Sequence, residues 1–297
     1  MVEVGRRVLI INADDLGYTR GVNEAIRQCF VAGCLRSATL MANGYAFDHA
    51  VGMLRDNEGL DVGVHLVLTE LPPVLSSSKI RGLVHENGCL PATPGELAAS
   101  LLCGAISKDA VRLELTAQIT KVLDHGLKPT HLDSHKHVHV LPQVLETVVE
   151  LARKYSIRWV RSPFDRTSVL CVGRLIERER IPSFCMQHLK AKLLHACRRG
   201  FTGEMRGSNL RNPDHFFGIS LTGAWNEAVM VRLVKEVRPG VTEWMVHPGD
   251  CDGDLIRLKT RLLKQRETER DLLMSSELKD HIARLGITLS SFRTEDK

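Results

Sequence analysis

The sequence predicts an α/β protein with a parallel sheet, most simply a TIM-like (β/α) barrel that is distorted or incomplete. Short apolar runs alternate with amphipathic helical stretches along the chain, and no segment has the character of a linker between domains. The length of 297 residues also suits such a barrel, because about 250 residues is typical of the fold. We therefore expect a single domain over residues 1–297, with an open doubly wound sheet as the alternative.

The first predicted strand leads into a pair of carboxylates. Residues 8–12 form a continuous apolar run, which is typical of a strand buried on both faces, and residues 21–33 then have the pattern of a helix. Asp14 and Asp15 lie between them. One such aspartate would be interpreted as a helix cap or a turn residue. Two adjacent carboxylates repel each other unless a cation or a shared proton offsets the repulsion, so we interpret the pair as functional.

The next two predicted strands cover residues 37–43 and 60–68, with a short helix at 47–55 between them. The second strand ends at Asn43, and the third contains His65 inside an apolar run. A single histidine in a strand is either a hydrogen-bonded core residue or a ligand, and the sequence leaves both interpretations open. The proline-rich segment 70–94 is predicted to be a long loop, which in a compact domain is typically functional or mobile.

A cluster of histidines follows two further predicted helices, at residues 95–107 and 109–127. The chain has 13 histidines, and four of them lie within residues 131–139 together with one aspartate: His131, Asp133, His135, His137 and His139. In an extended strand these odd-numbered positions would share one face. A polar strand edge is the alternative, but the cluster favours a metal site where the strand runs out into a loop. Side chains two residues apart are separated by about 6.6 Å, so further ligands must come from elsewhere.

The C-terminal half is predicted to continue the alternation. The expected elements are a helix at 141–155, a strand at 158–163, a basic helical insertion at about 166–212 with a helix near 182–197, a strand at 214–220, a helix at 225–237, a strand at 241–247, a helix at 255–285 and a last strand at 287–292. Arg161 lies near the end of one of these strands, and His247 ends another.

Composition excludes several classes of function. The net charge of +5 is modest, and aromatic residues make up only 5% of the chain, so we expect no nucleic-acid partner. The eight cysteines are scattered without C-x-x-C spacing, which predicts reduced thiols. We expect a cytoplasmic protein without a membrane partner, because no leader pattern or apolar run of about 20 residues occurs. The sequence leaves open whether the protein forms a homo-oligomer.

A barrel would bring the candidate residues together. The aspartate pair, His65, His135 and His247 each lie at or near the C-terminal end of a different predicted strand, the rim where barrels carry out chemistry. One aspartate with two histidines leaves open positions on an ion, as in catalytic metal sites. Such a site supports metal-assisted hydrolysis of an amide or ester, and the residues alone do not separate this from phosphate-ester hydrolysis. No glycine-rich nucleotide motif is present.

Four segments resemble the motifs of the YdjC family of carbohydrate deacetylases, which includes bacterial chitooligosaccharide deacetylases. These segments are residues 12–17, 63–69, 129–139 and 247–248, in the same order and at similar intervals as in the family. The resemblance implies a TIM-like barrel that removes acetyl groups from N-acetylated sugars or oligosaccharides. It also implies a divalent metal cation held by Asp15, His65 and His135, with Asp14 as general base and His247 as general acid.

The resemblance implies Mg²⁺ as the cation, whereas two imidazoles also suit Zn²⁺, Co²⁺ or Mn²⁺. Arg161, Asn43 and Asp133 are further candidates for substrate binding. Lys136 stands where bacterial members often have histidine, so we do not expect it to be a ligand, and Leu16 stands where phenylalanine is common. The alternatives are a metal-dependent phosphoesterase and a non-catalytic sugar- or protein-binding barrel that retains the metal site.

Overall fold

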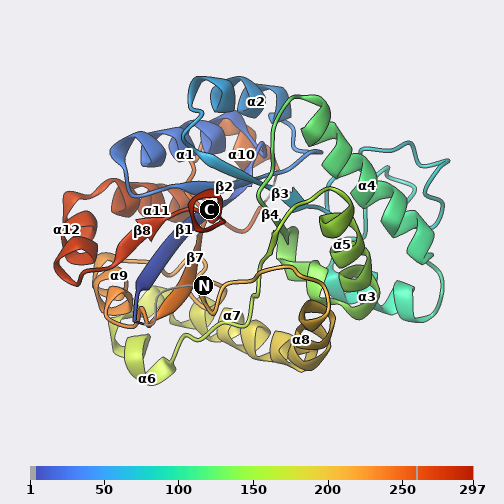
Figure 1. Ribbon diagram of the computed structural model, residues 1–297. Helices are drawn as coiled ribbons and strands as arrows, with labels where there is room; N and C mark the ends of the chain where they lie inside the picture. Colours follow the sequence, from blue (N-terminus) through green and yellow to red (C-terminus); the bar gives the residue numbers. More distant parts are fainter. Residues whose placement is uncertain (1–4, 259, 297) are drawn as a thin grey trace.

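The computed structural model describes residues 5–258 and 260–296 and has one parallel sheet surrounded by helices (Figure 1). The strand order is β5-β4-β3-β2-β1-β7-β6, and β8 pairs with β1 outside this path. The strands are β1 (Arg7–Leu16), β2 (Ser37–Leu40), β3 (Asp61–Leu66), β4 (His131–Ser134), β5 (Trp159–Val160), β6 (His215–Phe217), β7 (Gly240–Val246) and β8 (Thr288–Ser290).

The long strand β1 lies at the centre of the sheet. It pairs in parallel with β2, β7 and β8, and its residues from Val8 onward are buried, as the continuous apolar run predicts. At the two ends of the strand order, Trp159 of β5 forms a parallel bridge with Arg211, which lies just before β6. The sheet therefore curls into an incomplete barrel. This confirms the predicted distorted TIM-like barrel and not the open doubly wound sheet.

Helices follow most strands and cover the outside of the sheet (Figure 1). They are α1 (Arg20–Ala32), α2 (Phe47–Asp56), α3 (Pro94–Leu102), α4 (Lys108–Asp124), α5 (Pro142–Lys154), α6 (Val169–Val172), α7 (Ile181–Leu194), α8 (Arg198–Arg206), α9 (Glu227–Val234), α10 (Gly253–Arg257), α11 (Lys264–Met274), α12 (Ser276–Arg284) and α13 (Phe292–Glu295). None of the helices in the described ranges is both long and apolar enough to cross a membrane. The insertion at about 166–212 is helical, as expected, and contains α6, α7 and α8.

The histidine cluster does not form one continuous strand. Strand β4 ends at Ser134, and a 3-10 turn (His135–Val140) follows, in which Lys136 and His137 have left-handed φ values of 55° and 58°. The prediction that all five side chains share one face is therefore wrong. The turn separates His135 from the side chains of the strand.

The C-terminal region also differs from the prediction. The single helix expected at residues 255–285 is three shorter helices, α10, α11 and α12. Asp252 caps the start of α10, and Ser275 caps the start of α12. The last strand, β8, covers three residues, and Ser291 then caps α13. This division lets α11 turn toward the C-terminal ends of β1 and β7.

Candidate metal centre

Asp15 presents an unpaired oxygen to two imidazoles at the end of β1. Its Oδ1 atom is buried without a hydrogen-bond partner among the described residues. It lies 3.5 Å from Nε2 of His65 and 3.4 Å from Nδ1 of His135, and these ligand atoms are all within 4.8 Å of one another. Arg266 binds the other oxygen, Oδ2, at 2.5 Å. A buried carboxylate oxygen without a partner is costly, so this arrangement fits a bound cation.

The backbone at Asp15 is left-handed, with φ of 68°. This conformation is uncommon outside glycine, and it turns the chain sharply where β1 ends. Gly17, two residues later, also has a positive φ, and its N–H donates to Oδ1 of the buried Asn23 at 2.6 Å. The sharp turn accounts for the different surroundings of Asp14 and Asp15.

A carboxylate orients His65 from behind. The Oδ1 atom of Asp133, in β4, lies 2.7 Å from Nδ1 of His65. The Nε2 atom of His65 therefore points toward Asp15. Thr39 of β2 donates to Oδ2 of Asp133 at 3.1 Å. Metal-binding histidines typically have such a partner on the second ring nitrogen, which sets the tautomer and the ring orientation.

His135 has a similar partner that sequence reasoning missed. Its Nε2 lies 3.0 Å from Oε2 of Glu70, and Glu70 also forms an ion pair with Lys136. Glu70 follows β3 and has a left-handed φ of 70°. The only sequence signal was an acidic residue shortly after a strand that contains His65.

Asp14 belongs to a buried ion-pair network centred on Arg161. Arg161 is 1% exposed and donates to both oxygens of Asp14, at 2.6 and 2.7 Å. It also lies 2.7 Å from Asp133 and 2.8 Å from Glu243 of β7. Burial raises the pKa of Asp14, and the charge of Arg161 opposes this effect. Burial raises the pKa of Glu243 to about 7.

His247 follows β7 at the same end of the sheet. It is 9% exposed, and its Nδ1 has no hydrogen-bond partner among the described residues. Burial lowers the pKa of its imidazole to about 3, although the charge of Asp15 opposes the shift. Its backbone N–H donates to Glu269 of α11 at 2.6 Å, which holds the residue in place. The ring is therefore neutral in the free protein.

Two of the three remaining histidines of the cluster have hydrogen-bond partners, and the third, His137, packs edge-on against Phe216. His131 lies 3.0 Å from Oδ1 of Asn12 and stacks on Phe292, and His139 lies 3.0 Å from the carbonyl oxygen of Arg161.

Asn43, one of the candidates for substrate binding, donates to the carbonyl oxygen of Pro72 at 2.8 Å. It thereby ties the long loop after β3 to the segment that follows β2, which ends at Leu40 and not at Asn43 as predicted.

Comparisons with known proteins agree with this architecture. The family model described as YdjC-like protein matches residues 8–284. A protein of Brevibacillus brevis named carbohydrate deacetylase is 33% identical, over 96% of this chain and 98% of its own length. One of Salmonella newport named chitooligosaccharide deacetylase is 31% identical over the same shares.

A solved structure is also similar over nearly its whole length. This crystal structure, of an Enterococcus faecalis V583 protein described as a candidate cellobiose-phosphate cleavage protein, has a TM-score of 0.75 and 25% sequence identity. The match covers 98% of this chain and 99% of that one. The family match over most of the chain and the full-length relatives show that the chain belongs to the YdjC-like protein family.

Proposed function

We propose that the protein is a metal-dependent hydrolase that removes acetyl groups from N-acetylated carbohydrates. The observation that carries the proposal is the unpaired, buried Oδ1 of Asp15 facing two imidazoles whose other nitrogens are held by carboxylates. Full-length relatives named carbohydrate deacetylase and chitooligosaccharide deacetylase support the choice of substrate.

We assign the cation to Oδ1 of Asp15, Nε2 of His65 and Nδ1 of His135. A divalent cation there supplies Lewis acidity, which polarises the acetyl carbonyl and lowers the pKa of water. Mg²⁺ is the cation that the family resemblance implies, and the two imidazoles also suit Zn²⁺, Co²⁺ or Mn²⁺. Asp133 and Glu70 hold the imidazoles so that the assigned nitrogens face Asp15.

Two side chains are assigned to proton transfer. Asp14 takes a proton from the attacking water, and His247 delivers one to the nitrogen that leaves with the sugar. Arg161 holds both oxygens of Asp14, which orients the carboxylate and favours its ionised form. Because burial lowers the pKa of His247 to about 3, its ring has to take up a proton before it delivers one. His247 takes up its proton from solvent and Asp14 releases its proton to solvent, so that the protons balance in each turnover.

We assign positioning roles, instead of substrate contacts, to the three other residues that the sequence suggested. Arg161 and Asp133 are buried and use their polar atoms within the ion-pair network. Asn43 binds the backbone at Pro72 and so fixes one end of the long loop. Their substitution would act on the substrate through the residues that they hold.

Acetate release tests the proposal directly. The purified protein, loaded with Mg²⁺, Mn²⁺, Co²⁺ or Zn²⁺, is incubated with N-acetylglucosamine and its β-1,4-linked oligomers. We expect a chelator to abolish acetate release and one of the added cations to restore it. His85→Ala, in an exposed loop, is a matched control for His65→Ala, which should release no acetate. Absence of release by every metal-loaded sample, on a broad panel of acetylated sugars, would contradict the proposal.

A phosphoesterase is the second candidate, because the similar Enterococcus faecalis structure is described in terms of a sugar phosphate. The basic side chains near the proposed cation site offer little support for phosphate binding. Arg161 is buried in three ion pairs, and Lys136 is paired with Glu70. Phosphate release from a panel of sugar phosphates by the same samples separates the two activities.

A further inference from the structure

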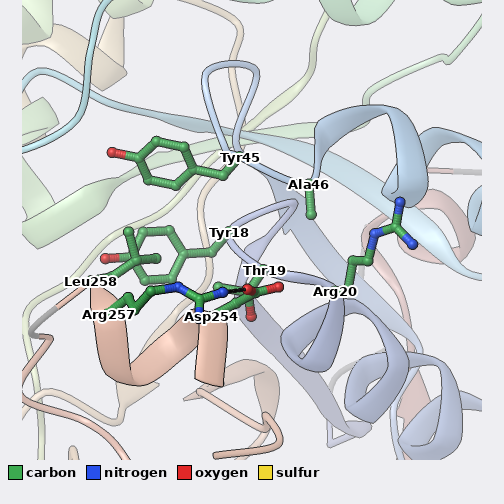
Figure 2. A pocket seen from close by; sticks show the side chains of 8 residues that line it. All are labelled: Tyr18, Thr19, Arg20, Tyr45, Ala46, Asp254, Arg257 and Leu258. Carbon is green, nitrogen blue, oxygen red and sulfur yellow. Dashed lines mark hydrogen bonds and ion pairs between the residues drawn. The ribbon is translucent and has the colours of Figure 1, made fainter. Parts of the chain in front are cut away.

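A pocket of about 260 Å³ opens near the N-terminus of α1 (Figure 2). It is formed by the turn after β1, by the loop after β2 and by α10 with the residue that follows it. The residues used in the argument are Tyr18, Tyr45, Asp254 and Arg257. The volume is just below the roughly 300 Å³ at which pockets for drug-sized ligands begin, so it suits a ligand of one small ring.

Two tyrosine rings form one wall of this pocket. Their centroids are 6.4 Å apart and their planes are inclined by 42°. Tyr18 is 7% exposed, whereas Tyr45 is 59% exposed. In Figure 2 the rings lie one above the other, with both hydroxyl groups directed to the same side. An exposed aromatic ring supported by a buried one provides a flat apolar surface with a polar edge.

The two rings are held in place without a ligand. Asn23 accepts from the N–H of Gly17 at 2.6 Å and donates to the carbonyl oxygen of Ala46 at 3.0 Å. The N–H of Ala46 donates to the carbonyl oxygen of Gly17 at 2.8 Å, and a Cβ atom on Gly44 would overlap that oxygen. The turn that carries Tyr18 and the loop that carries Tyr45 are therefore locked together. A preformed site loses less conformational entropy on binding.

Tyr18 connects the pocket to the turn that carries Asp15. Its backbone N–H donates to the carbonyl oxygen of Asp15 at 3.0 Å, within the turn that directs the Asp15 carboxylate. The tyrosine wall therefore begins three residues after the proposed ligand Asp15, in the same turn of the chain.

The other side of the pocket offers polar groups that suit sugar hydroxyls. Asp254 and Arg257 of α10 form an ion pair below Tyr18, so that a carboxylate acceptor and a guanidinium donor lie next to the aromatic wall (Figure 2). A β-linked pyranose has an apolar face made of axial C–H groups and a rim of hydroxyls. Its face can pack on the ring of Tyr45, while its rim meets the ion pair.

We propose that the Tyr18–Tyr45 pocket is a subsite for a second sugar ring, next to the ring whose acetyl group is removed. The inference rests on the proposed function and deepens it, because it makes a linked saccharide of at least two rings the preferred substrate. The metal centre holds the acetylated ring, and the tyrosine wall holds its neighbour.

Binding of unacetylated sugars tests the subsite without turnover. Isothermal titration calorimetry compares glucosamine with its β-1,4-linked dimer on the full-length, metal-loaded protein. We expect the dimer to bind about tenfold more tightly, and Tyr45→Ala to remove most of this gain. Tyr45→Phe keeps the ring and should retain it. Leu170→Ala, at a residue of α6 that is 98% exposed and outside the pocket, is the matched control and should match the wild type.

Turnover adds a second measurement. With the N-acetylated dimer, Tyr45→Ala should raise KM about tenfold while kcat changes less than twofold, because the ring binds the substrate away from the reacting bond. Since Tyr45 is mostly exposed, the variant should melt at the same temperature as the wild type.

The outcomes separate the subsite from the proposed function. The subsite is refuted if the wild type binds the dimer no more tightly than glucosamine, or if Tyr45→Ala binds the dimer as tightly as the wild type. Acetate release with either of these results leaves the deacetylase proposal standing. A gain for the dimer that depends on Tyr45, without acetate release from any sugar, supports the subsite and contradicts the deacetylase.

Discussion

The Nδ1 atom of His65 lies 2.7 Å from Oδ1 of Asp133, and this contact turns the opposite nitrogen of the ring toward Asp15. Both side chains are buried, and Asp133 is itself held by Thr39 and Arg161. The orientation of an imidazole at the proposed cation site therefore depends on a carboxylate that does not belong to the proposed ligand set. Several consequences of this arrangement can be measured.

Asp133→Asn should weaken cation binding without removing a ligand. The amide can no longer stabilise the tautomer of His65 as the carboxylate does, and the loss of such a partner typically costs 10- to 100-fold in metal affinity. Titration calorimetry with Mg²⁺ or Zn²⁺ measures the change. Asp109→Asn, at an exposed position of α4, is the control and should bind as the wild type does. Equal affinities for the wild type and Asp133→Asn would show that the contact does not position the ligand.

Removal of the cation should lower the melting temperature of the wild type. A ligand that binds only the folded state at 100 times its Kd contributes about 2.7 kcal/mol to stability. Differential scanning fluorimetry with and without a chelator should therefore show a shift that is absent in His65→Ala and present in His85→Ala. If His65→Ala showed the same shift as the wild type, the cation would bind elsewhere.

Glu243 should make stability depend on pH. Its folded-state pKa is about 7, above the ordinary value of 4.5, because burial favours the neutral form. Arg161, Asp133 and Asp14 are the charged groups that face it, and the first of them opposes the shift. A raised pKa contributes stability below about pH 4.5, and this contribution is lost as the pH rises through 7.

The loss between pH 5 and pH 8 should be on the order of 2–3 kcal/mol in the wild type. Glu243→Gln does not titrate and should lack this component, since its amide oxygen can still accept from Arg161. Urea unfolding at the two pH values measures the difference. Parallel pH dependences for the two proteins would mean that Glu243 stays ionised in the fold.

His247→Ala should reduce kcat by about 10²- to 10⁴-fold, with a smaller change in KM, because the proposed proton donor acts on the leaving nitrogen. The melting-temperature shift with cation should persist, since His247 is not among the grouped ligand atoms. An unchanged kcat would remove His247 from the mechanism. Loss of the cation-dependent shift in melting temperature would instead identify His247 as a ligand of the cation.

Much of the fold could be predicted because it depends on local pattern. The apolar run from Val8 predicts a strand buried on both faces, and the alternation that follows predicts a parallel sheet. In such a sheet the C-terminal ends of strands meet at one rim, so the aspartate pair, His65, His135 and His247 could be grouped before their positions were known. The 3-10 turn after Ser134 could not be predicted, because alternating polar residues fit a strand as well as a turn.

The residue pattern was enough to predict the alternation of strands and helices and the residue types at the strand ends. Which side chains meet depends on the packing of elements that are far apart in the chain. Arg266 binds Asp15 across 251 positions of the chain, from a helix whose charged residues resemble an ordinary solvated surface. Arg161 is buried among three carboxylates, although its position after a short strand suggested a substrate contact. Local pattern sets the element to which a residue belongs, whereas the partner of a charged side chain depends on how distant elements pack, which no local spacing encodes.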